Sequence, residues 1–245
     1  MKEKYNKKTV VGIDIGGSKI NLVLWDGRKI IDRWHSRGVS LAKLKAGLDR
    51  FPAWRVGIGL AGILDFKTGR LLDSPNLRFL EGLVLKKLFG RQVRFDNDVK
   101  CFLRAETKIG AARSRGRVLA VALGTGIGGG IMFQKGQLYR GWHSSEAEFG
   151  EMVIDAGKTW EKLYQASQGR PAYQKKLHAQ GLANLVNIFD PEIIVLGGRG
   201  ALTPDRKLLE KLIVSPLAKK IKIVPAKLGN DAVAIGAALL WDDKK

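Results

Sequence analysis

The segment "VVGIDIGGSKINLVLWDG" (Val10 to Gly27) predicts two strands joined by a polar, glycine-rich turn. Aliphatic and β-branched residues on both sides of the turn are typical of buried strands. Asp14, Gly16 and Gly17 would weaken the interior of a strand, because glycine loses backbone entropy on folding and leaves no side chain to pack. We interpret the segment as a β-hairpin with a tight polar tip. Taken alone, the segment is equally compatible with a glycine-rich turn that only reverses the chain direction and binds nothing.

A second segment, "VLAVALGTGIGGGIMFQKGQLY" (Val118 to Tyr139), repeats the order strand, glycine-rich turn, strand. Repetition at a distance of roughly 110 residues indicates two related halves, each beginning with a hairpin. The backbone N–H groups of such turns can bind a phosphate chain without interference from side chains. The pair of turns therefore favours a phosphate-binding role over simple chain reversal.

Two common nucleotide-binding motifs are excluded by their context. "GTGIGG" satisfies G-x-G-x-x-G, but a dinucleotide-binding loop must lead into a helix, and here a strand follows that ends in a turn at Lys135 and Gly136. A P-loop is excluded because G-x-x-x-x-G-K-[ST] does not occur.

Length and composition predict a two-domain protein. The chain has 245 residues, 45% of them hydrophobic, and we expect one domain over residues 1–115 and a second over 116–230, with residues 231–245 packing back on the first. No apolar run suggests a membrane span, and the first residues lack the apolar core of a signal peptide. Cys101 is the only cysteine, which excludes an intramolecular disulfide and a cysteine-rich zinc site. A cytoplasmic location is expected.

The formal net charge of +20 is spread over many short clusters, such as Arg113, Arg115 and Arg117. The interpretation that we favour is a solvated basic surface with no dedicated partner, and we expect no specific nucleic acid and no membrane. Attraction of nucleic acid, of an anionic membrane or of a polyanionic substrate by long-range steering is the alternative interpretation.

Further elements alternate between helix and strand. "LEGLVLKKLFG" (Leu80 to Gly90) predicts a helix that ends at glycine, "RQVRFDNDVK" a strand that ends at Asp96, and "DAVAIGAALLWD" a final helix. Apolar spacing predicts another helix beginning near Asp98, where a carboxylate can simply cap the helix. The order of elements indicates an α/β protein.

Eight short motifs, in order, carry a family resemblance: "DIGGSK", "GLAG", "SPNL", "DND", "LGTGIGGG", "AEFGE", "IVLGG" and "IGAA". This series resembles the ROK family (repressors, open reading frames, kinases) of the actin/Hsp70/hexokinase superfamily. The resemblance implies two ribonuclease-H-like (actin-like ATPase) domains with a cleft between them that holds a sugar and a nucleotide. It also implies a sugar kinase that uses ATP and Mg²⁺.

The resemblance also implies roles for single residues. Asp98 resembles the catalytic base that accepts the proton of the attacking sugar hydroxyl, and Asp14 resembles the acid that organises Mg²⁺ as an indirect ligand. The remaining implied contacts to the sugar are Gly62, Asn76, Asn97, Glu148 and Glu161. The implied contacts to the nucleotide are Asp14, Gly16, Gly17, Ser18, Lys19, Gly124, Thr125, Gly126, Gly197 and Gly198.

The chain departs from the family pattern in two places. Glu151 stands where many members carry a zinc-binding histidine, and no cysteines follow it, so no zinc site is expected. His35, His143 and His178 are scattered along the chain. In "TWEKLYQAS" the spacing from Glu161 to Ser167 is longer than in the family, and the segment after Ser167 is shorter. That shortening is expected to reduce the sugar-side wall or the usual dimer surface, so a homodimer stays open.

Three classes of function follow. The first is an ATP- and Mg²⁺-dependent hexose kinase, with glucose as the leading sugar and fructose, mannose and N-acetylhexosamines open; polyphosphate is the alternative donor. The second, a sugar-responsive repressor, would need a helix-turn-helix before the first hairpin, where too few residues stand. The third is a nonenzymatic sugar-binding or regulatory protein, which is disfavoured by the presence of Asp98.

Overall fold

A computed structural model describes residues 9–51, 53–74, 76–85, 90–134 and 136–242. The chain forms two compact units, each considered by itself: unit 1 comprises residues 1–106 and 228–245, and unit 2 comprises residues 107–227. The division between them falls inside a helix, α2 (Asp98–Lys108), whereas the sequence placed it after residue 115. None of the described helices is both long and apolar enough to cross a bilayer.

Unit 1 is built on a five-stranded sheet with the order β3-β2-β1-β4-β7. Its first three strands form an antiparallel meander, and β4 and β7 run parallel to β1. Apolar residues of β1, β2 and β4 are almost wholly buried, as their aliphatic runs predicted. The elements are β1 (Val10–Ile15), β2 (Lys19–Trp25), β3 (Ile30–Arg37), α1 (Leu41–Asp49), β4 (Arg55–Leu60), β7 (Gln92–Asn97) and a small hairpin of β5 (Ile63–Asp65) and β6 (Arg70–Asp73).

Unit 2 repeats this arrangement with a sheet of order β10-β9-β8-β13-β14. The strand directions are also the same: β8, β9 and β10 are antiparallel neighbours, and β13 and β14 run parallel to β8. Its elements are β8 (Val118–Leu123), β9 (Ile127–Gln134), β10 (Gln137–Leu138), β11 (Val153–Asp155), β12 (Lys158–Thr159), α3 (Trp160–Ala166), α4 (Pro171–Phe189), β13 (Ile193–Gly197), α5 (Arg206–Leu212) and β14 (Lys222–Pro225).

The repeated topology confirms the α/β class and the two hairpins predicted from the glycine-rich segments. Three strands in a meander followed by two parallel strands is the sheet of the ribonuclease-H-like domain, and it occurs here twice in one chain. Each glycine-rich turn joins the first two strands of its sheet.

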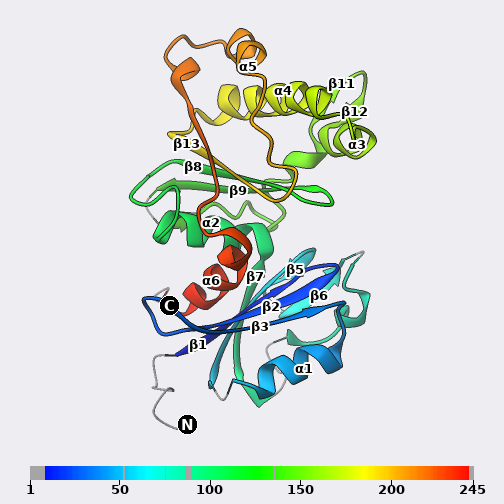
Figure 1. Ribbon diagram of the computed structural model, residues 1–245, viewed down its shortest axis with the longest axis vertical. Helices are drawn as coiled ribbons and strands as arrows, with labels where there is room; N and C mark the ends of the chain where they lie inside the picture. Colours follow the sequence, from blue (N-terminus) through cyan, green and yellow to red (C-terminus); the bar gives the residue numbers. More distant parts are fainter. Residues whose placement is uncertain (1–8, 52, 75, 86–89, 135, 243–245) are drawn as a thin grey trace. The chain divides into compact units, whose positions relative to one another are not determined.

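The last helix, α6 (Ala232–Ala238), packs on the sheet of unit 1, although more than 170 residues separate it from β4. A Cβ atom on Gly12 would lie 1.9 Å from the carbonyl oxygen of Ala234, and one on Gly57 would lie 1.9 Å from that of Ala237. The helix backbone therefore rests directly on the strands. On its other side α6 lies beside α2, where a Cβ on Gly236 would meet the backbone of Cys101 (Figure 1).

The helix predicted over Leu80–Gly90 is wrong for its described part. Residues Arg78–Leu80 form a short 3-10 turn, and Glu81 and Val84 form isolated bridges beside β6. Gly82 interrupts any helix there, because its φ of 74° lies in the left-handed region. Residues 86–89 lie outside the described residues, as do Pro75, Lys135 and the last three residues of the final segment.

The contact between α6 and the sheet gives a stability prediction. Gly57→Ala should lower the unfolding free energy by at least ~2 kcal/mol, because the new methyl group cannot share space with the α6 backbone. Gly116→Ala is the matched control, since a Cβ on Gly116 meets nothing within 4 Å; it should change the unfolding free energy by no more than about 0.5 kcal/mol. Urea denaturation of both variants measures this, and equal midpoints would contradict the packing.

Candidate active site

The first glycine-rich turn projects from the end of β1 and is held by its own backbone. The N–H of Gly16 donates to the carbonyl oxygen of Lys19 at 3.0 Å, and Gly17 and Ser18 are exposed. A Cβ on Gly17 would lie 2.9 Å from the side chain of Asn76, so the structure brings two predicted site residues into contact. Glycine at this place lets the turn and the Asn76 segment approach each other closely.

Gly62 packs against Asp73 and Ser74, just before Asn76 in the chain. Its φ of 120° is accessible in practice only to glycine, and a Cβ would lie 2.4 Å from the carbonyl oxygen of Asp73. Gly62 is therefore next to the loop that carries Asn76, whose side chain is exposed. The predicted sugar contacts Gly62 and Asn76 thus belong to one local cluster with Gly17.

Asp14, the last polar residue of β1, is buried within the sheet. Its pKa is raised to about 7, chiefly by desolvation and then by the nearby charge of Asp98, while the charge of Lys19 opposes both. In the register of the sheet Asp14 lies opposite Asn21 of β2 and Gly59 of β4, and Gly59 lies opposite Asp96 of β7. Because a buried carboxylate is poorly solvated, it is stabilised by binding a cation or a proton.

At the start of α2 the helix cap and the candidate catalytic carboxylate are two different residues, Asn97 and Asp98. The side-chain oxygen of Asn97 accepts hydrogen bonds from the N–H groups of Val99 at 3.0 Å and Lys100 at 3.3 Å, which is the work of a helix cap. Asp98 also accepts from the N–H of Val99, at 2.9 Å, but it is not required as the cap. Burial raises the pKa of Asp98, against the opposing effects of this hydrogen bond and of Lys100.

Asp96, the first acid of "DND", is fully buried and plays a structural part. Its carboxylate accepts from the N–H of Asn97 at 2.9 Å and lies 3.6 Å from the guanidinium of Arg104 on α2. The pair ties β7 to α2 and so fixes the helix that begins at Asp98. A buried ion pair is costly to break, because the remaining charge loses its partner.

The second glycine-rich turn, in unit 2, packs against α3 and the end of β13. The N–H of Gly124 donates to the carbonyl oxygen of Gly126 at 2.9 Å, and a Cβ on Gly126 would lie 2.3 Å from the carboxylate of Glu161. That carboxylate accepts from the N–H of Ile127 at 2.6 Å. Gly197 pairs with Ala122 at the end of β8, and a Cβ on Gly198 would meet the backbone of Leu123.

The loop that carries Glu148 leads into a 3-10 turn, Phe149–Glu151. Glu148 and Glu151 are exposed, as is His143, and His35 is exposed on β3 of unit 1. His178 instead lies fully buried on α4, with Nε2 3.2 Å from the carbonyl oxygen of Gly200; desolvation lowers its pKa. Across the described part of the chain, no three His, Cys, Asp or Glu side chains gather closely enough to hold a metal ion.

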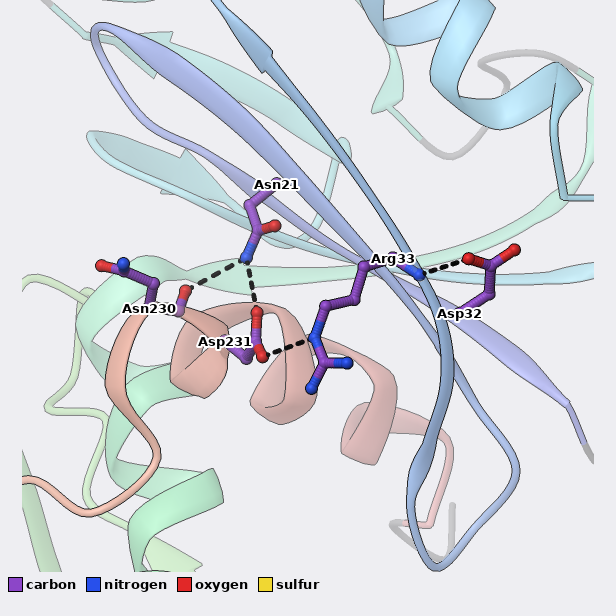
Figure 2. A network of polar contacts seen from close by, with 5 residues as sticks. All are labelled: Asn21, Asp32, Arg33, Asn230 and Asp231. Atoms are coloured by element: carbon purple, nitrogen blue, oxygen red, sulfur yellow. Dashed lines mark hydrogen bonds and ion pairs between the residues drawn. The ribbon is translucent and has the colours of Figure 1, made fainter.

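The sequence did not predict a polar network around Asn21, the residue that lies opposite Asp14 in the sheet (Figure 2). Asn21 donates to the carbonyl oxygen of Asn230 at 3.1 Å and to the carboxylate of Asp231 at 3.2 Å, and Arg33 Nε donates to that carboxylate at 2.9 Å. These bonds anchor the start of α6 to β2 and β3 (Figure 2). No sequence pattern indicated it: Asn21 and Arg33 belong to neighbouring strands, but Asp231, to which both donate, lies 210 residues after Asn21.

The raised pKa of Asp14 gives a pH prediction. In the folded chain this carboxyl keeps its proton up to about pH 7, whereas in the unfolded chain it ionises near 3.8. Its contribution to stability is therefore complete only below pH 3.8 and is lost progressively as the pH rises from there to about 7. Asp14→Asn mimics the protonated form. It should raise the unfolding free energy by more at pH 8 than at pH 5, with a difference of roughly 1–3 kcal/mol between the two pH values.

Thermal or urea unfolding at the two pH values measures this difference. The control is Asp65→Asn, because the Thr68 hydroxyl and backbone N–H groups lower the pKa of Asp65, and its loss should bring no gain at pH 8. A difference between Asp14→Asn and the parent that does not vary with pH would refute the prediction.

Comparison with known proteins shows the family of this chain. The profile of the ROK family matches residues 10–168 and 160–244. An N-acetyl-D-glucosamine kinase of Aliivibrio salmonicida is 27% identical, with 94% of this chain and 98% of that protein aligned over 302 positions. A glucokinase of Pyrobaculum calidifontis is 30% identical, with 94% of each chain covered. Because 302 positions exceed the 245 residues of this chain, the A. salmonicida protein contains segments without a counterpart here.

The solved structures show the same fold. A ROK family glucokinase from Streptomyces griseus, in complex with glucose and AMPPNP, superposes with a TM-score of 0.78 at 25% identity, covering 95% of this chain and 98% of that one. The two profile matches together extend over most of the chain and take in both glycine-rich turns, Asp98 and α6. The chain therefore belongs to the ROK family and has its actin-like ATPase fold.

Proposed function

We propose that this protein is a sugar kinase that transfers the γ-phosphoryl group of ATP to a hydroxyl of a hexose. The observation that carries the proposal is the division of roles at the start of α2. Asn97 caps the helix, so Asp98 is not needed as the cap, and burial raises its pKa beside the buried Asp14. A carboxyl group in that state is suited to accept a proton from an attacking hydroxyl.

In this reaction the hexose oxygen forms a bond to the γ-phosphorus while the bond from that phosphorus to the β,γ-bridging oxygen breaks. The hydroxyl proton passes to the carboxylate of Asp98, and ADP leaves. The raised pKa makes Asp98 a stronger base than an ordinary aspartate, provided that it is ionised when the sugar binds. Gly62, Asn76 and Asn97 of unit 1, and Glu148 and Glu161 of unit 2, are the proposed sugar contacts.

Asp14 is the proposed acidic group for Mg²⁺, and its burial next to another carboxylate fits a cation. When bound, Mg²⁺ neutralises charge on the phosphate oxygens. The exposed tips of the two glycine turns are the proposed phosphate contacts: Gly16, Gly17, Ser18 and Lys19 in unit 1, and Gly124, Thr125 and Gly126 in unit 2. Gly197 and Gly198 are the proposed contacts near the adenosine. No zinc enters this proposal.

Glucose is the proposed sugar. The S. griseus relative holds glucose, and the P. calidifontis relative is a glucokinase, while the A. salmonicida relative is an N-acetyl-D-glucosamine kinase. A coupled ADP-release assay over glucose, mannose, fructose and N-acetyl-D-glucosamine tests the choice. The kcat/KM for glucose should be the highest of the four. A higher value for N-acetyl-D-glucosamine would reassign the substrate but keep the kinase.

Polyphosphate is the second candidate donor, and the net charge of +20 favours it. A basic surface attracts a long polyanion more strongly than it attracts ATP, and that attraction weakens as salt rises. We expect ATP to be the preferred donor when both are present at equal phosphoryl concentration. Competition between the two donors at low and at high salt decides the matter.

The role of Asp98 gives the central prediction. Asp98→Asn keeps the shape of the side chain and an oxygen for the Val99 N–H, so the affinity for the sugar should stay near that of the parent and the melting temperature should not fall. Turnover should fall by roughly 10²–10⁴-fold, since an amide cannot accept the proton.

Asp205→Asn is the matched control, because Asp205 caps α5 through the N–H of Leu208 and lies outside the proposed site. It should keep full turnover. Turnover of Asp98→Asn within a few-fold of the parent would remove the basis for the kinase assignment and leave a binding or regulatory role.

A further inference from the structure

Three side chains of α3 contact the backbone of the second glycine turn. Glu161, Tyr164 and Gln165 are three and four residues apart and therefore lie on one face of the helix. The Tyr164 hydroxyl donates to the carbonyl oxygen of Gly124 at 3.2 Å, and the Gln165 amide donates to that of Thr125 at 3.3 Å. The Gln165 amide also donates to Glu161 at 3.1 Å, and Glu161 accepts from the N–H of Ile127.

These bonds fix the direction in which the peptide groups of the turn point. In a planar trans peptide the C=O of one residue and the N–H of the next point in opposite directions. With the carbonyl oxygens of Gly124 and Thr125 turned toward α3, the N–H groups of Thr125 and Gly126 must point away from it. Within the described residues neither of these two N–H groups donates a hydrogen bond.

The tight packing around the turn keeps this arrangement from relaxing. A Cβ on Gly126 would lie 2.3 Å from Glu161, and one on Gly200 would lie 1.9 Å from the Tyr164 hydroxyl. Tyr164 is almost fully buried, so its hydroxyl has little competition from water. Two preorganised N–H donors that both point away from α3 are suited to bind an anionic phosphoryl group.

We propose that Tyr164 and Gln165 are positioning residues, which orient the Thr125 and Gly126 N–H groups toward the phosphates of the nucleotide. The inference rests on the proposed function in so far as that turn binds phosphate. It also gives Glu161 a second task, because its carboxylate fixes the N–H of Ile127 at the end of the same turn. Tyr164 and Gln165 follow Glu161 by three and four residues, which places all three side chains on the face of α3 that contacts the turn.

The experiment is isothermal titration of Mg²⁺-AMPPNP into the parent and into Tyr164→Phe, Gln165→Ala and the double variant. Each single change removes one hydrogen bond to the turn and should weaken nucleotide binding by about threefold to tenfold, and the double change by more. In steady-state assays the KM for ATP should rise in the same proportion, with the KM for the sugar unchanged within twofold.

Gln168→Ala is the matched control. Gln168 is also a glutamine near the end of α3, and its amide donates to a backbone carbonyl at 3.3 Å, but that carbonyl belongs to Tyr164 and not to the turn. It should leave nucleotide affinity within twofold of the parent. Melting temperatures report whether any variant has lost its fold.

Nucleotide affinity of the double variant within twofold of the parent would overturn the proposal. A parallel loss of nucleotide affinity, sugar affinity and melting temperature would also overturn it, because a general structural defect would then explain the result. A parent protein that binds AMPPNP but phosphorylates no sugar would refute the proposed function alone, since the titrations still test Tyr164 and Gln165. A parent that binds no nucleotide would refute both.

Discussion

The close approach of one helix backbone to one sheet is the constraint on which unit 1 depends. Gly12 and Gly57 leave no side chain between the strands and α6, and Gly236 allows α6 to lie equally close to α2. Since α2 begins at Asp98, the position of the proposed base follows from these contacts as well as from β7. The polar network of Asn21, Arg33 and Asp231 then fixes the start of α6 beside the strand that carries Asp14.

Asp14 is both buried in the packed sheet and close to a second carboxylate, Asp98. A carboxyl group that is nearly inaccessible to water would ordinarily be avoided, because its ionised form is poorly solvated. Here it lies close enough to Asp98 for their charges to repel, with Lys19 as the opposing charge. Such an arrangement lowers the stability of the free protein at neutral pH and strengthens its attraction for a cation. Stability given up at a site of this kind is a common feature of binding and catalytic centres.

Much of this was accessible from the sequence, because local patterns determine local structure. The alternation of aliphatic residues with a glycine turn predicted both hairpins, and their repetition predicted the duplicated sheet. The Leu80–Gly90 prediction failed because apolar spacing does not reveal that Gly82 adopts a left-handed conformation. Asn97 and Asp98 are both good caps, so only the hydrogen bonds could show that Asn97 serves as one. The bond between Asn21 and Asp231 depends on register and on a separation of 210 residues, which no local pattern encodes.

The discontinuity of unit 1 affects the order in which the protein can fold during synthesis. Unit 2 is one unbroken stretch, residues 107–227, and it can close its core as soon as that stretch has emerged from the ribosome. Unit 1 is made first but completed last, because the glycine face of its sheet stays uncovered until α6 has been translated. During that interval its exposed apolar strands are prone to aggregate. A truncation near residue 230 would thus damage chiefly the domain that begins the chain.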